Sequence, residues 1–142
     1  MRVVKKPLRI YVAGPLSDVK GSKCPFFIRL LHSVEADKVA KELFLKGHWP
    51  FCPHTQFRWW FEDVRPEFLS YELIVEHLDI QGWLSVCDAI FLMPGWEESR
   101  GASTEAQWAK QNGLQIFHSL NEVPEVEGWR EKKALAVTKI LN

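Results

Sequence analysis

Residues 87–105 read CDAIFLMPGWEESRGASTE, and this stretch decides the fold of the chain. Its apolar run, residues 89–93, is typical of a strand that is buried on both faces of a parallel sheet. A turn marked by Gly95 follows, and apolar residues then recur at helical spacing from near Ala102 until Gly113 ends the pattern. A buried strand, a glycine-containing turn and a helix in this order predict an α/β unit.

The rest of the chain continues this alternation of strands and helices. Three further strands are predicted at residues 8–13, 48–52 and 114–117, and three further helices at residues 25–46, 66–85 and 129–141. In the helix at residues 66–85, the residues expected on the inward side are Tyr71, Val75, Leu78 and Gly82. In the last helix they are Val137 and Ile140. The pattern predicts a single domain over residues 1–142, with a three-layer, doubly wound parallel sheet of the flavodoxin or Rossmann type.

The order of the strands predicts where a ligand binds. Pro50 favours an edge position for the second strand. If the order of the strands resembles 2-1-3-4, the first and third strands are neighbours. Their connections then leave on opposite sides of the sheet, and a cleft opens at their carboxyl ends. The residues expected to face this cleft are Tyr11, Ala13, Gly14 and Pro15 from one side and Gly95, Ser99, Gly101 and Glu105 from the other.

Composition excludes several classes of partner. Lys plus Arg equals Asp plus Glu at 18 each, so net charge suggests neither a nucleic-acid duplex nor a membrane surface as a partner. No apolar run approaches membrane-spanning length. The three cysteines are widely spaced and lack a CxxC pair, as in reduced cytosolic proteins without a zinc site. We therefore expect a cytoplasmic protein that binds a small molecule, without a metal.

Glu105 is the strongest candidate for a reactive group. It falls on a helical stripe with Ala102, Ala106 and Ala109, whose small side chains let a helix lie close to a sheet. A capping-box glutamate would need Ser or Thr three residues earlier, where this chain has Ala102. A carboxylate on such an inward stripe indicates function. Because Glu105 lies near a helix start, we expect it to stay ionised, as a nucleophile requires.

Four other residues each have a structural and a functional interpretation. Asp79 either faces inward from the preceding helix or faces solvent. Ser99 either binds a phosphate ahead of a helix or only caps that helix. Trp59 lies in the aromatic segment RWWF, which either stacks a planar base or forms a subunit interface. Cys52, two residues before His54, has no second His or Cys cluster that would make a metal site or support a nucleophile.

Three motifs together resemble the nucleoside 2-deoxyribosyltransferase-like superfamily. They are IYVAGP at residues 10–15, PHTQF at residues 53–57, and the CDAI, PGW, SRGA and final E of residues 87–105. The resemblance covers about residues 8–118 and is to the small uncharacterised bacterial and phage branches of the superfamily. Enzymes of this superfamily cleave the N-glycosidic bond of (deoxy)nucleosides or of their monophosphates.

The resemblance implies a role for each site residue. Glu105 matches the glutamate that attacks the anomeric carbon, and Tyr11 matches the tyrosine near that nucleophile. Ser99 is similar to the serine with which 2′-deoxynucleoside 5′-phosphate N-hydrolases bind phosphate, where the transferases have an aspartate for the free 5′-hydroxyl. Asp79 stands nine residues before Asp88, whereas the aspartate of the family commonly stands eight residues before its counterpart.

We therefore expect cleavage or transfer at the N-glycosidic bond of a (deoxy)nucleoside 5′-monophosphate. Glu105 would be the nucleophile, Tyr11 would hold it in line, and Asp79 would orient the sugar hydroxyls or protonate the departing base. The residues expected to bind the substrate are Gly14, Pro15, Gly95, Ser99, Gly101 and Trp59. No cofactor is expected, and the resemblance implies a homodimer or a higher homo-oligomer. Two alternatives stay open: a non-catalytic nucleotide sensor and a Trp-rich interaction protein.

Overall fold

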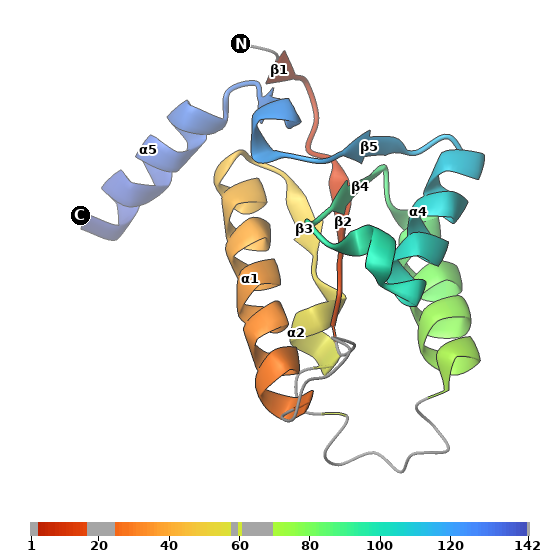
Figure 1. Cartoon of the computed structure of the whole chain (residues 1–142). Helices are drawn as coiled ribbons and strands as arrows, with labels where there is room; N and C mark the ends of the chain where they lie inside the picture. The colour runs from red at the N-terminus through yellow and green to blue at the C-terminus, as the bar shows by residue number, and fades with distance from the viewer. Residues whose placement is uncertain (1–2, 17–24, 58–59, 61–69, 142) are drawn as a thin grey trace.

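A four-stranded parallel sheet forms the centre of the molecule (Figure 1). The computed structural model describes residues 3–16, 25–57, 60 and 70–141. The strands of this sheet are β2 (Arg9–Ala13), β3 (Trp49–Phe51), β4 (Ala89–Leu92) and β5 (Gln115–Phe117). They lie in the order β3-β2-β4-β5. The four predicted strands and their order are therefore confirmed, and β3, which contains Pro50, is an edge strand.

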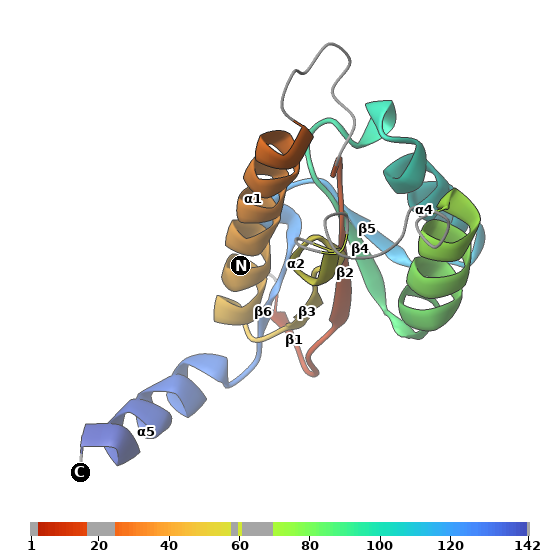
Figure 2. The ribbon, with the colours of Figure 1, turned by 90° about the horizontal axis from the view of Figure 1, so that it is seen from below.

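Helices cover both faces of this sheet. Side chains alternate along β2, so that Ile10 and Val12 pack toward α1 (Pro25–Leu45), while Tyr11 packs on the opposite face. That opposite face is covered by η2 (Glu72–Trp83) and α4 (Arg100–Gln111). Figure 2 shows α1 and α4 on the two sides of the strands. The three-layer α/β architecture predicted from the sequence is confirmed.

The helix η2 differs from the prediction in its winding. It is a π-helix, and at its end the Leu84 N–H contacts the carbonyl oxygens of both Asp79 and Ile80. Because a π-helix has wider turns than an α-helix, its inward residues are spaced by four to five positions. Val75, Asp79 and Ile80 are buried, while Gly82 is exposed. Of the predicted inward stripe, Val75 is buried, Tyr71 packs against the core and Leu78 is half-buried, so the prediction is wrong only for Gly82. The inward option for Asp79 is confirmed.

Two contacts fix the ends of the central strand pair. At the amino end, the Arg9 N–H donates to Asp88 Oδ2 at 2.7 Å, which gives Asp88 the structural role expected for it. At the carboxyl end, the Met93 N–H donates to the Ala13 carbonyl at 2.8 Å. A Cβ at Gly14 would lie 2.9 Å from Met93 Cβ, so only glycine fits there. The carboxyl ends of β2 and β4 are thus held side by side.

The chain ends form a second, smaller unit beside the sheet. Here β1 (Val3–Val4) pairs in parallel with β6 (Glu125–Val126), next to the short helix η5 (Leu120–Glu122). The short elements β1, β6, η5, η4 (Trp96–Glu98) and α2 (Pro53–Phe57) were not predicted from the sequence, whereas η3 (Leu84–Val86) lies at the end of the helix predicted over residues 66–85. Their lengths, from 2 to 5 residues, are too short for a hydrophobic period to appear.

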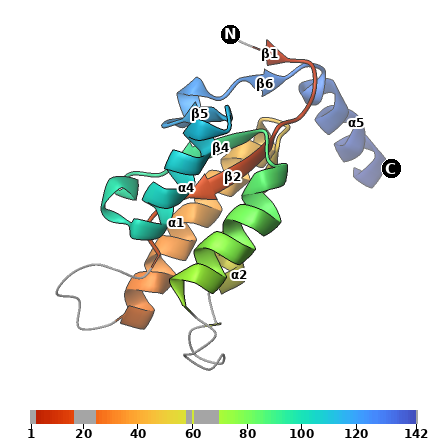
Figure 3. The same cartoon turned by 90° about the vertical axis from the view of Figure 1, so that its right-hand side faces the viewer.

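The last helix, α5 (Trp129–Leu141), projects from the body of the molecule (Figure 3). It lies where the sequence predicts a helix, but none of its side chains is buried. Val137 is 54% exposed and Ile140 83% exposed, so the prediction that they face inward is wrong. Among the described residues, no helix combines the length and the apolar character that a membrane crossing needs.

Candidate functional site

A cavity of about 280 Å³ opens at the carboxyl ends of β2 and β4. Its walls come from the end of β2 and the turn after it, from the start of α2, from η2, and from the first turns of α4. The connections after β2 and β4 leave toward opposite faces of the sheet, so the cavity lies at the topological switch point of the fold. This is the position that the sequence predicts for a ligand.

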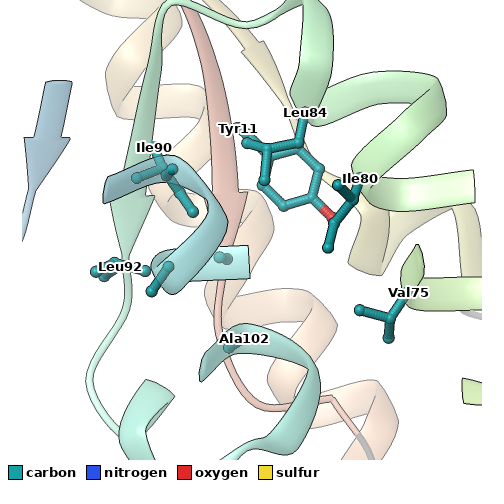
Figure 4. Packing of buried hydrophobic residues seen from close by; sticks show 10 residues of the cluster. Tyr11, Val75, Ile80, Leu84, Ile90, Leu92 and Ala102 are labelled. Atoms are coloured by element: carbon teal, nitrogen blue, oxygen red, sulfur yellow. The ribbon is translucent and has the colours of Figure 1, made fainter. Parts of the chain in front are cut away.

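Three buried titratable side chains meet on the inner wall of the cavity. Tyr11 is 0% exposed, and Asp79 and Glu105 are each 5% exposed. The Tyr11 hydroxyl donates a hydrogen bond to Glu105 Oε2. Figure 4 shows the Tyr11 ring pointing away from its strand, with its hydroxyl toward Ile80 on η2. The structure therefore brings together the three residues that the sequence proposes for catalysis.

The two carboxyl groups hold protons more readily than free carboxyl groups do. Burial raises the pKa of Asp79 to about 7, and hydrogen bonding to Tyr11 and Glu105 only partly offsets this rise. Burial and the charge of Asp79 raise the pKa of Glu105 well above its usual value. Burial also raises the pKa of Tyr11. The expectation that the helix start keeps Glu105 ionised is therefore wrong, because burial outweighs that effect.

Asp79 also has an oxygen without a partner. Among the described residues, nothing forms a hydrogen bond with Asp79 Oδ1, although this atom is buried. A buried acceptor that lacks a partner costs free energy, and native proteins seldom leave one unsatisfied. Since Asp79 lines the cavity, a ligand hydroxyl is a suitable donor for this oxygen.

The first turn of α4 forms the opposite end of the cavity. Ser99 accepts a hydrogen bond from the Ala102 N–H at 3.2 Å, so its role as the cap of α4 is confirmed. Ser99 also lines the cavity, as does Gly101. A Cβ at Gly101 would lie 3.3 Å from Val75 Cγ2, so the glycine lets α4 lie close to η2. The helix begins at Arg100, two residues before the predicted start.

The remaining predicted binding residues divide into three groups. Gly14 and Pro15 line the cavity. Gly95 does not line it, but adopts a left-handed conformation with φ 89°, in a turn where its Cβ would meet Pro15 at 3.4 Å. Trp59 lies outside the described residues, so its expected contact with a base or a subunit stays a prediction.

Sequence reasoning missed several residues that shape the cavity. His54 is buried, and its Nε2 donates to the Pro15 carbonyl at 2.8 Å. Burial lowers the pKa of His54, in agreement with a neutral ring that braces this turn. The PHTQF motif contained this residue but gave no hint of its role. Arg100 also lines the cavity, together with Tyr71, which the sequence places on the inward side of its helix, but no pattern in the sequence indicated that these two residues meet.

Comparisons with known proteins identify one family. A family model described as a domain of unknown function, DUF4406, matches residues 8–118. No curated protein and no solved structure matches the chain. Within the described ranges, no group of three or more His, Cys, Asp and Glu side chains is arranged to hold a metal ion. The matched range contains the whole four-stranded sheet and every residue that lines the cavity.

Proposed function

The chain belongs to the family of the DUF4406 domain, and we propose that it cleaves or transfers the N-glycosidic bond of a (deoxy)nucleoside 5′-monophosphate. The observation that carries this proposal is the pair of buried carboxyl groups, Glu105 and Asp79, on the wall of one cavity. Glycosidic bonds are commonly cleaved by two such groups. The motifs that resemble the nucleoside 2-deoxyribosyltransferase-like superfamily support a nucleoside as the substrate.

The hydrogen bond from Tyr11 gives the two carboxyl groups different roles in our proposal. Its hydroxyl donates to Glu105, and this bond favours the ionised form of Glu105. Two carboxyl groups that interact this closely titrate as a pair, and near neutral pH the pair keeps one proton. In our proposal the reactive form is the one in which Asp79 holds this proton and Glu105, which accepts a hydrogen bond from Tyr11, is ionised. The site then contains a nucleophile and an acid.

The proposed reaction proceeds in two steps. A carboxylate oxygen of Glu105 attacks C1′ of the sugar while the bond from C1′ to the base nitrogen breaks. The base leaves with the bonding electron pair and takes the proton of Asp79. Water then attacks C1′, the bond to Glu105 breaks, and the water gives a proton to Asp79. Alternatively, an N–H nitrogen of a second base attacks C1′, displaces Glu105 and gives its proton to Asp79. Water gives hydrolysis, and a second base gives transfer.

The first turn of α4 is suited to hold the phosphate of the substrate. Backbone N–H groups at a helix start favour anions, and a serine hydroxyl can donate to a phosphate oxygen. Ser99 and Gly101 supply these groups on the cavity wall. Gly14 and Pro15 form the facing wall, where their backbone approaches the same space.

The proposal is tested by offering the protein a panel of ribo- and deoxynucleoside monophosphates and the matching nucleosides, and by detecting free base chromatographically. We expect at least one monophosphate to release its base, and Glu105→Ala to lower the rate by about a hundredfold or more. Glu35→Ala, which removes a glutamate with a 52% exposed side chain on α1, should keep the full rate. Base release that survives in Glu105→Ala would exclude Glu105 as the nucleophile.

The same assay separates hydrolysis from transfer. When a second free base is added, a transferase forms a new nucleotide that carries the added base. A hydrolase releases the first base at an unchanged rate and forms no new nucleotide.

One observation favours a second function, that of a nucleotide sensor. The raised pKa of Glu105 weakens this carboxyl group as a nucleophile near neutral pH. Binding of a monophosphate without release of any base would support the sensor. The homo-oligomer implied by the resemblance is part of our leading proposal, and light scattering in solution tests it.

A further inference from the structure

We propose that Arg100 is the residue by which the cavity selects a phosphorylated sugar over an unphosphorylated one, and that Tyr71 positions it. This inference rests on the proposed function for the kind of ligand. It adds a residue that determines specificity and a second residue that acts through the first.

Arg100 lies at the end of the cavity that is proposed to hold the phosphate. It is the first residue of α4, and it lines the cavity together with its neighbours Ser99 and Gly101. The helix start contributes only a partial positive charge, whereas a guanidinium contributes a full charge and a planar set of donors that fits phosphate oxygens. Of the groups at this turn, the Arg100 side chain therefore has the largest difference in affinity between a phosphate and a hydroxyl.

Tyr71 holds the Arg100 guanidinium by its face. The guanidinium carbon of Arg100 lies 3.8 Å from the centre of the Tyr71 ring, which is the geometry of a cation–π contact. Stacking of this kind covers one face of the guanidinium and leaves the N–H groups at its edge accessible. Within the described ranges, the ion pairs are Lys38–Glu35 and Arg130–Glu125, so no carboxylate there competes for Arg100.

The ring of Tyr71 is in turn fixed to α4. The Thr104 hydroxyl donates to the Arg100 carbonyl at 2.9 Å. Its hydrogen is therefore engaged, and Tyr71 must be the donor in the hydrogen bond between the Tyr71 and Thr104 hydroxyls. This bond ties the ring to the same turn of helix that carries Arg100. The guanidinium is thus oriented before a ligand arrives, which lowers the entropy cost of binding.

The cavity consequently has a cationic end and an acidic end. Arg100 and Glu105 are five residues apart on α4, a rise of about 7.5 Å along the helix axis. A pentose with a 5′-phosphate can cover this span with its anomeric carbon toward Glu105. At the acidic end, the unpartnered Asp79 Oδ1 can accept a hydrogen bond from a hydroxyl of the sugar. Both ends therefore point to a sugar phosphate.

The test uses ribose 5-phosphate and ribose as probes, because neither contains a base or an N-glycosidic bond. Binding is followed by NMR titration of the whole chain. We expect ribose 5-phosphate to bind at least tenfold more tightly than ribose. Arg100→Met should weaken ribose 5-phosphate binding by about tenfold or more and leave ribose binding unchanged, and Arg100→Lys should recover part of the loss.

Two controls separate the roles of the residues. Arg9→Met removes another guanidinium that lies over an aromatic ring, 5.2 Å from the centre of Trp49, but Arg9 does not line the cavity. This variant should bind ribose 5-phosphate as the wild type does. Tyr71→Phe keeps the ring and loses the bond to Thr104, so we expect a smaller loss than in Arg100→Met. In the Arg100→Met background, Tyr71→Phe should cause no further loss, because Tyr71 acts through Arg100.

Two outcomes would overturn this inference: equal binding of ribose and ribose 5-phosphate by the wild type, or unchanged ribose 5-phosphate binding in Arg100→Met. A different outcome concerns only the proposed reaction. If selection of the phosphate depends on Arg100 but no monophosphate releases its base, the inference stands and glycosidic cleavage fails.

Discussion

Asp79 makes the stability of the protein depend on pH. Its pKa rises from 3.8 to about 7 on folding, so between these values the folded chain binds more protons than the unfolded chain does. Stability therefore falls as pH rises from about 4 through about 7, and the penalty is complete above pH 7. We expect Asp79→Asn to be more stable than the wild type at pH 8 by about 1 to 3 kcal/mol. At pH 4 the two proteins should be similar.

Urea unfolding at pH 4, 6 and 8 measures this difference. Glu35→Gln, which changes an exposed carboxyl group on α1, is the matched control and should follow the wild type at each pH. If Asp79→Asn were the less stable protein at pH 8, the ionised Asp79 would be a stabilising group, and the predicted cost of ionising it in the folded chain would be wrong. The same variant should also release base more slowly, since it cannot protonate the departing base.

At the scale of elements, the sequence predicts the strands and helices that produce a local hydrophobic pattern. The apolar runs before Gly14 and Pro94 predict β2 and β4, and the switch point between them follows from the strand order. The winding of η2 could not be predicted, because a π-helix and an α-helix differ in spacing by less than one residue per turn. The raised pKa of Glu105 was missed for a different reason: it depends on burial in the folded chain and on the charge of Asp79, which is distant in sequence.

The close pairing of β2 and β4 leads to a prediction for Gly14. Because an alanine Cβ would lie 2.9 Å from Met93 Cβ, the two strand ends must separate to admit it. We expect Gly14→Ala to lose about 1 to 3 kcal/mol of stability. It should also weaken ribose 5-phosphate binding, since Gly14 lines the cavity.

A matched control is Gly82→Ala on η2. An added Cβ there would meet its nearest neighbour only at 3.7 Å, which is ordinary contact. This variant should be as stable as the wild type or slightly more stable, because alanine is the better helix former. Thermal unfolding of both variants makes the comparison, and equal stability of Gly14→Ala and the wild type would contradict the close packing.

At the scale of the whole molecule, His48 joins the chain ends to the sheet. Its Nδ1 accepts from the Leu8 N–H at 3.0 Å, and its Nε2–H donates to the Pro124 carbonyl at 2.5 Å. This arrangement needs a neutral ring, and burial lowers the pKa of His48. In the unfolded chain the pKa of a histidine is about 6.5. The stability that this contact contributes is therefore present above pH 6.5 and is lost as the pH falls below that value.

We therefore expect the His48 ring to titrate below 6.5 in an NMR pH titration. The amide of Leu8 should lose protection from hydrogen exchange at pH 5 relative to pH 7.5, because a protonated Nδ1 cannot accept its hydrogen. The amide of Val12, in the centre of the sheet, is the control and should stay protected. Titration of His48 at or above 6.5 would contradict this assignment.

The projecting helix α5 should contribute little to the stability of the domain. It is anchored near its start: the Trp129 Nε1–H donates to the Leu45 carbonyl at 2.9 Å, the Trp129 ring packs edge-on against Phe44, and Lys133 Nζ donates to the same carbonyl at 3.3 Å. Since no side chain of α5 is buried, deletion of residues 134–142 should shift the melting temperature by less than about 4 °C. Trp129→Ala should cost more, about 1 to 3 kcal/mol, because it also removes the contact with Phe44. Ribose 5-phosphate binding should be unchanged in the truncated chain, because the cavity lies within residues 11–105. A large loss of stability on truncation would show that α5 packs against further protein surface in solution.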